Sequence, residues 1–159
     1  MDSEIDLAKI VALQREINIR KARENLWAYC CIVSPDFYKA DRWHLWLMCE
    51  TLQALYERKL TKELFWDLCH APVVPKWYAE YVEWDKIVEN MIYTRLMQNI
   101  SPRYGKSRTL TNACDWFLGK NVQNKIITVS YNSVLPRPCT GEAFHHPDQV
   151  RAEALTGHY

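Results

Sequence analysis

The stretch that decides the predicted fold is a short loop, Ser101-Pro102-Arg103-Tyr104-Gly105-Lys106-Ser107. The apolar, β-preferring segment 92–100 precedes it and predicts a strand. The segment 107–118 predicts a helix ending at Gly119, with apolar residues at helical spacing: Leu110, Ala113, Cys114 and Phe117. A second apolar run, 125–130, predicts another strand. This order of elements predicts an α/β fold in which a helical N-terminal region is followed by the start of an incomplete P-loop NTPase sheet.

The residues of the loop suit a polyphosphate ligand. A helix that begins at the end of the loop points its unpaired N–H groups and its positive dipole end at the ligand. Gly105 lets the backbone approach, Lys106 is the expected phosphate ligand, and the Ser107 hydroxyl is the expected Mg²⁺ ligand. The full pattern G-x-x-x-x-G-K-[ST] is not met, because Ile100 occupies the place of its first glycine. A surface turn that leads into a helix is the alternative interpretation.

The residues 99–107 resemble the deviant Walker A motif of the terminase large subunits of tailed phages, in which the first glycine is replaced and Pro-Arg precedes Gly-Lys-Ser. The runs 116–119 and 126–132 are similar to the helix end and the second strand of that ATPase domain. The stretch 42–45, with Leu52 and Gln53, resembles the helix before its core. The resemblance covers residues 22–132, and only the loop and its two strands are specific.

The resemblance implies an ATP hydrolase whose lineage function is the ATP-driven packaging of viral DNA into capsids, with ATP and Mg²⁺ as cofactors. Lys106 and Arg103 would be catalytic, and Arg103 would reach the γ-phosphate as a finger in cis; a surface ion pair is the alternative for Arg103. Ser107 would bind the metal. The cofactor would contact the whole loop: Pro102, Arg103, Tyr104, Gly105, Lys106, Ser107 and Arg108.

The implied partners are a terminase small subunit, a portal protein and double-stranded DNA, with homo-oligomerisation also possible in this family. The implied location is the cytoplasm of a bacterial host, with the chain encoded by a phage or prophage. No membrane partner is expected, since the sequence has no apolar run of about eighteen residues.

The chain is expected to be an incomplete ATPase. Phosphoryl transfer also needs an acidic Mg²⁺ ligand after a further strand, and a residue that orients the attacking water. No apolar run ending in acidic residues follows residue 132, neither Asp115 nor Glu142 follows a predicted strand, and the nuclease carboxylates of the family are missing. We therefore expect the truncated chain alone to be inactive. Two alternatives stay open: a helicase-like P-loop ATPase, and a non-enzymatic truncated interaction module.

Three regions are predicted: a helical N-terminal region at 1–90, the P-loop strand-loop-helix-strand at 91–132, and an irregular tail at 133–159. The resemblance stops at 132, which suggests an interrupted gene or reading frame, and the His145-His146 pair in the tail is interpreted as incidental. Within the first region the expected helices are 2–33 (one helix or two abutting ones), 42–58 capped by Asp41, 61–68 capped by Thr61, and 76–90.

Two stripes at helical spacing are predicted to be core. One consists of Leu45, Met48, Leu52 and Leu55. The other consists of Trp77, Tyr81, Trp84 and Val88, for which the stacking of nucleic-acid bases is the less favoured interpretation. By the resemblance, His44 or Gln53 would lie near the adenine end of a nucleotide, and a structural role is the favoured alternative for His44.

The composition is that of one core of ordinary size: 159 residues, 48% of them apolar, with seven Trp and nine Tyr. A formal net charge of +1 excludes a strongly basic protein, so any DNA contact would need a local patch. The six cysteines form no C-x-x-C pair and no export signal is present, which favours reduced thiols in the cytoplasm. Cys69-His70 lacks the partners of a zinc site.

Overall fold

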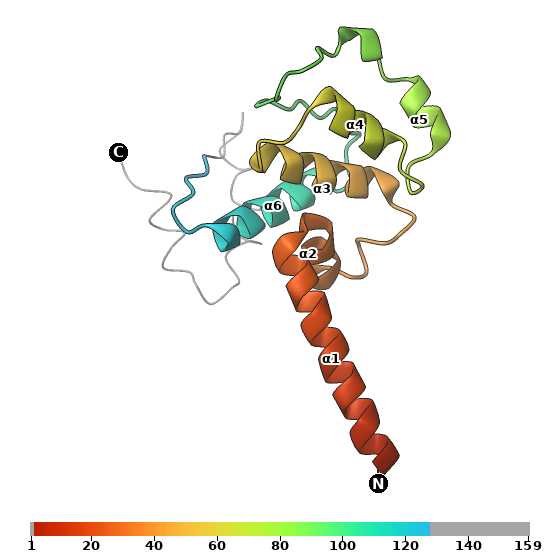
Figure 1. Cartoon of the computed structure of the whole chain (residues 1–159), viewed down its shortest axis with the longest axis vertical. Coiled ribbons are helices and arrows are strands. Elements are labelled where there is room, and N and C mark those ends of the chain that lie inside the picture. The colour runs from red at the N-terminus through yellow and green to blue at the C-terminus, as the bar shows by residue number, and fades with distance from the viewer. Residues whose placement is uncertain (1, 128–159) are drawn as a thin grey trace. The chain divides into compact units, whose positions relative to one another are not determined.

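The computed structural model describes residues 2–127 and divides the chain into two compact units between Gln98 and Asn99. The elements of the first unit are α1 (Asp2–Glu24), α2 (Leu26–Val33), α3 (Trp43–Tyr56), α4 (Lys62–Cys69), α5 (Lys76–Glu80) and the 3₁₀ turn η1 (Trp84–Lys86) (Figure 1). The second unit carries α6 (Lys106–Lys120).

The N-terminal helical segment consists of two abutting helices rather than one. No Gly or Pro occurs between residues 2 and 33, yet the helix is interrupted at Asn25, whose φ of −130° is extended. The Asn25 side chain accepts a hydrogen bond from the N–H of Ala28 over 2.8 Å and so caps the start of α2. α2 ends at Val33, before Pro35, as the sequence predicts.

The core of the first unit forms where successive helices from α2 to α5 pack on one another. Leu45, Met48 and Leu52 of the predicted α3 stripe are buried, whereas Leu55 is half-buried. The buried thiols of Cys30 and Cys49 join α2 to α3 with an Sγ–Sγ distance of 3.9 Å. That distance is about twice the length of a disulfide bond, so both are free thiols.

A second buried cluster, formed by Leu47, Cys69 and Ala79, is surrounded by half-buried aromatic side chains that include Trp43, Phe65, Tyr78 and Trp84. The Trp84 indole N–H donates to the carbonyl of Ala79 over 2.9 Å, which satisfies its polar atom at the edge of this cluster.

The predicted helix over 76–90 is wrong beyond its first turns, because α5 ends at Glu80 and η1 follows. The helical spacing therefore does not continue to Val88. Trp77 and Tyr81 are 53% and 79% exposed, so the prediction that they belong to the core is wrong as well.

The two predicted caps have different outcomes. The Thr61 hydroxyl accepts from the N–H of Leu64 over 3.2 Å, so the prediction of Thr61 as the N-cap of α4 is confirmed. The predicted cap of α3 at Asp41 is wrong: the residue before the helix is Arg42, and no side chain caps this end.

The predicted α/β fold is wrong for the part of the chain that the structure describes: residues 2–127 contain helices and irregular segments but no strand. The segment 92–100 is irregular, with Met97 94% and Ile92 54% exposed, whereas Leu96 and Ile100 are half-buried. A strand needs a partner strand for its backbone N–H and C=O groups, and β-preferring residues alone do not supply one. The second predicted strand is irregular at 125–127, and its remainder lies outside the described residues.

In the second unit, α6 runs from Lys106 to Lys120 and contains Gly119, which is therefore not the predicted helix stop. The buried side chains of this helix recur at helical spacing and are Thr109, Asn112, Ala113 and Trp116. Of the predicted apolar residues only Ala113 is among them, and Leu110 is 44% exposed. The predictions on the tail 133–159, including those on Glu142, His145 and His146, lie outside the described residues.

Candidate functional site

The loop 101–105 turns the chain sharply into α6. Arg103 and Gly105 both adopt left-handed backbone conformations, with φ of 67° and 84°. Gly105 is the residue before the helix, so α6 begins at Lys106, as the loop-to-helix step in the sequence predicts. Backbone N–H groups at such a turn and in the first turn of the helix form a concave set of donors that suits an anion.

The side chain of Lys106 folds back over the loop. Its Nζ lies 3.5 Å from the carbonyl oxygen of Ile100, at the limit of a hydrogen bond, and the residue is half-buried. Ile100 occupies the place of the first glycine of the Walker pattern, so the lysine and the start of the loop are close in space. The ammonium group of Lys106 therefore lies next to the start of the loop.

The remaining predicted loop residues lie at the surface. Pro102, Arg103, Tyr104, Ser107 and Arg108 are all exposed, and Tyr104 is 56% exposed. No ion pair among the described residues involves Arg103, so the alternative interpretation of this arginine as part of a surface ion pair finds no partner there. The Ser107 hydroxyl and the side chains of Arg103 and Arg108 are therefore accessible from solvent.

The sequence on both sides of the loop carries an excess of positive charge, although the whole chain is nearly neutral. Between residues 90 and 114 the sequence contains Arg95, Arg103, Lys106 and Arg108 and neither Asp nor Glu. The absence of acidic residues from this stretch can be read from the sequence, but the net charge of +1 for the whole chain does not reveal it. A helix that begins inside such a segment combines its positive dipole end with this positive charge, which favours an anionic ligand.

Asp115 is the one acidic residue among the described residues of the second unit, 99–127, and so the one there that could share a metal with the loop. Asp115 is on α6, eight residues after Ser107, which is about 12 Å along a helix. Among residues 2–127 no three or more His, Cys, Asp or Glu side chains are grouped as they would be around a metal ion. The loop therefore suits a metal ion only when a bound phosphate supplies ligands in addition to the Ser107 hydroxyl.

Gln53, which the resemblance offered as a contact for adenine, is fully engaged in the first unit. Its Oε1 accepts from the N–H of Leu26 over 2.9 Å, and its Nε2 donates to the carbonyl of Glu24 over 2.9 Å and to Glu57 over 2.8 Å. His44 is half-buried and packs edge-to-face on Trp43, with 5.9 Å between ring centroids. These contacts support a structural role for both residues.

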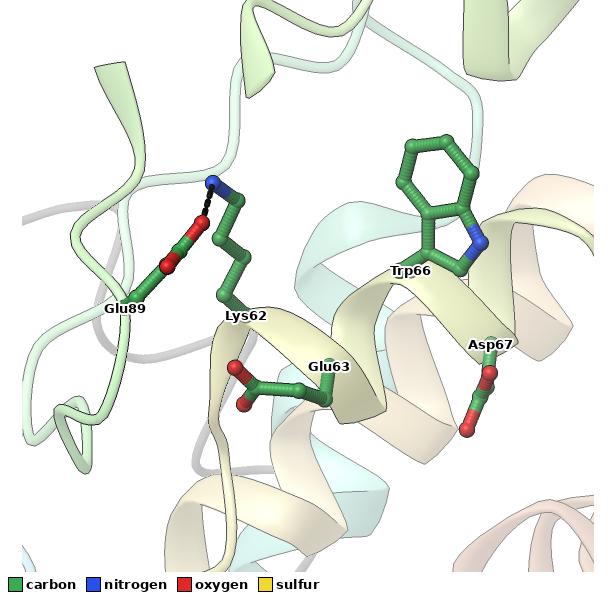
Figure 2. A pocket seen from close by; sticks show the side chains of 5 residues that line it. All are labelled: Lys62, Glu63, Trp66, Asp67 and Glu89. Carbon is green, nitrogen blue, oxygen red and sulfur yellow. Dashed lines mark hydrogen bonds and ion pairs between the residues drawn. The ribbon is translucent and has the colours of Figure 1, made fainter. Parts of the chain in front are cut away.

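Figure 2 shows a shallow hollow of about 240 Å³ on the first unit, lined by Lys62, Glu63, Trp66, Asp67 and Glu89. Lys62 turns toward Glu89 and pairs with it over 3.0 Å, while the Asp67 side chain points away from that pair (Figure 2). Trp66 is stacked on His70, with 4.1 Å between ring centroids. The hollow groups charged residues that the sequence analysis did not single out, but no pair of them is set for acid–base chemistry.

The described helices include none that has both the length and the apolar character needed to cross a bilayer. Comparisons of the chain with protein-family models, with curated proteins and with solved structures found no match. The loop is therefore interpreted from its residues and its local geometry.

Proposed function

We propose that the loop 101–108 binds the phosphates of ATP together with Mg²⁺. The observation that carries this proposal is the left-handed Gly105 directly before Lys106, which is the first residue of α6. A residue without a Cβ at that position leaves the approach to the first N–H groups of the helix open. The absence of Asp and Glu between residues 90 and 114 supports an anionic ligand.

Each residue of the loop would contact a different part of the ligand. The N–H groups of the first turn would contact phosphate oxygens, and Lys106 would exchange its contact with the Ile100 carbonyl for the β- and γ-phosphates. Ser107 would share Mg²⁺ with the phosphates. Arg103, exposed and without an ion pair among the described residues, would add a second positive charge.

By its resemblance to terminase large subunits, we place the chain in the lineage of ATP-driven DNA packaging. Its partners would then be a small subunit, a portal protein and double-stranded DNA. Hydrolysis would also need an acidic Mg²⁺ ligand and a residue that orients the attacking water. Both would have to come from residues other than the loop. The proposed activity of this loop is therefore nucleotide binding, with turnover dependent on further groups.

A specific observation favours a second candidate, a non-enzymatic interaction module. Residues 2–127 contain no strand, and a P-loop enzyme places its catalytic carboxylates at strand ends. In this alternative the helical first unit contacts a protein partner and the loop holds no nucleotide.

Calorimetric titration of the full chain with ATP, with and without Mg²⁺, separates the two candidates. We expect saturable binding that weakens at least about tenfold, or 1.4 kcal/mol, in Lys106→Ala. Lys125→Ala is the matched control, because Lys125 is exposed, lies in the same unit and loses the same charge. No binding to the wild-type chain at millimolar ATP, or equal losses in the two variants, would favour the interaction module.

Ser107→Ala tests the metal part of the proposal separately. We expect this variant to bind ATP with an affinity that no longer increases when Mg²⁺ is added, whereas binding in the absence of Mg²⁺ stays unchanged. Addition of a terminase small subunit and a portal protein tests the lineage. ATP binding without any binding to these two partners would favour a helicase-like ATPase.

A further inference from the structure

An exposed apolar stripe runs along α1 and has no role in the loop described above. Five aliphatic side chains form this stripe, with exposed fractions between 46% and 62%: Leu7, Ile10, Val11, Leu13 and Ile17. At 100° per residue they fall within less than half of the helix circumference. A soluble helix normally buries such a stripe, so its exposure indicates that another surface covers it.

The remainder of the first unit leaves this stripe uncovered. In Figure 1, α1 extends away from α3, α4 and α5. Its C-terminal end packs on α2 and accepts the hydrogen bond from Gln53 of α3 at Glu24. The helix is 23 residues long, so it spans about 35 Å and offers a long edge for a partner.

We propose that this partner is α1 of a second copy of the chain, packed in the antiparallel direction. The area fits a weak dimer. If each of the five side chains still exposes roughly 100 Å², two copies would bury roughly 1,000 Å² of apolar surface, just below the 1,200–2,000 Å² of stable interfaces. The pairing is therefore expected to depend on protein concentration in the micromolar range.

The charges along α1 select the antiparallel direction. The sequence of the helix starts with the acids Asp2, Glu4 and Asp6, and ends with Arg20, Lys21 and Arg23 before Glu24. Two parallel helices would place like charges together at both ends, whereas antiparallel helices place opposite charges together. The macrodipole of a single helix favours the same charge distribution, but it does not account for the apolar stripe.

An antiparallel pair centred on Ala12 also matches the stripe to itself. Each residue then lies opposite the one at the same distance on the other side of Ala12, so that Leu7 faces the second copy's Ile17, and Val11 faces its Leu13. Four of the five apolar residues thus face one another, whereas Ile10 lies opposite Gln14 and Lys9 lies opposite Arg15. Near each end of the pair, Glu4 lies opposite Arg20.

Sedimentation equilibrium of the full chain between about 1 and 100 µM measures this association. We expect the average mass to rise from 18.9 kDa toward twice that value as the concentration increases. Ile17→Glu should abolish the rise, because it places a charge in the stripe. Ile19→Glu is the matched control: the same residue type, 40% exposed rather than 46%, lies on the opposite side of the helix and should leave the association unchanged.

A double variant tests the direction. In the antiparallel pair, Leu7→Glu combined with Ile17→Lys places opposite charges together, so the double variant should associate more tightly than either single variant. In a parallel pair it would place like charges together and abolish association. Circular dichroism of each variant controls for the loss of helix.

Three results would overturn the proposal. These are a wild-type chain that stays at the monomer mass at 100 µM, equal effects of the substitutions at Ile17 and Ile19, or a double variant that is weaker than both single variants. Binding of the monomer to vesicles of anionic lipid, with loss in Ile17→Glu, would assign the stripe to a membrane surface instead. None of these measurements involves nucleotide, so they are independent of the proposed function of the loop.

Discussion

The side-chain amide of Gln53 on α3 donates a hydrogen bond to the carbonyl oxygen of Glu24, the last residue of α1, over 2.9 Å. Its oxygen accepts from the N–H of Leu26, the first residue of α2, over 2.9 Å. One side chain thus satisfies an acceptor at the end of one helix and a donor at the start of the next. The interruption at Asn25 is therefore fixed by a residue that is distant in the sequence.

Gln53→Ala is expected to destabilise the first unit by about 1–3 kcal/mol, because it leaves the backbone groups at this junction without their partner. The measurement is the midpoint of urea unfolding followed by circular dichroism. Gln14→Ala is the control: Gln14 is exposed and its amide reaches only Asn18, over 3.1 Å. Equal small effects in both variants would show that water replaces the Gln53 contacts without loss.

Gly105, directly before α6, and Gly119, within it, are expected to respond to alanine with opposite signs. Gly105 has a φ of 84°, a conformation that costs an L-residue about 1–2 kcal/mol, so Gly105→Ala should destabilise α6. Gly119 is helical and has nothing within 4 Å of an added Cβ, so Gly119→Ala should stabilise the helix by about 0.5–1 kcal/mol. Hydrogen exchange of the α6 amides reports both effects, and a shift of the same sign in both variants would contradict the geometry of the loop.

Thr61→Ala is expected to destabilise α4 by about 1 kcal/mol, because the N–H of Leu64 loses the hydroxyl that accepts its hydrogen bond. Thr61→Ser keeps that oxygen and should recover most of the loss. Thermal unfolding of the three proteins makes the comparison. A serine variant as unstable as the alanine variant would mean that the methyl group, rather than the cap, provides the stability.

The thiol of Cys69 should make stability decrease in alkaline solution. Burial raises the pKa of Cys69 to about 11, whereas an unfolded cysteine titrates near 8.5. Between these two values the unfolded chain loses the proton first, so the free energy of unfolding is fully retained below pH 8.5 and falls as the pH rises toward 11. Burial also raises the pKa of Tyr78, which adds to the fall in the same direction.

The measurement is the denaturant midpoint at about pH 8 and pH 10 in the presence of a reductant, for the wild type and for Cys69→Ala. The variant loses packing and is less stable at both values, so the change between the two pH values is the informative quantity. A smaller change in Cys69→Ala is expected. An unchanged pH dependence would show that Cys69 does not contribute to it.

Sequence reasoning succeeded where a local signal decides the structure. The Thr61 cap, the end of α2 before Pro35, and the start of a helix directly after Gly105 all follow from residues within one turn of the feature itself. The burial of Leu45, Met48 and Leu52 followed from their spacing on one long helix. Each of these features is fixed by neighbours in the sequence.

Sequence reasoning failed where contacts between residues distant in the sequence determine the structure. The apolar residues at 92–100 predict a strand, but a strand also needs a partner, and none exists among the described residues. Trp77 and Tyr81 would lie on one face only if the helix continued past both residues. It does not, because α5 ends at Glu80. On α6 the apolar spacing predicts the helix but not its buried residues, which include the polar Thr109 and Asn112, whereas Leu110 is exposed.

The contact between Lys106 and Ile100 has a consequence for the anion binding proposed for the loop. The ammonium group lies 3.5 Å from the oxygen of a neutral amide, and it pairs with no carboxylate among the described residues. Within this part of the chain, its release therefore breaks no ion pair and leaves no unpaired negative charge. An arriving anion competes only with that dipole and with the salt ions of the solution, so capture should be fast, and its strength should fall as ionic strength rises.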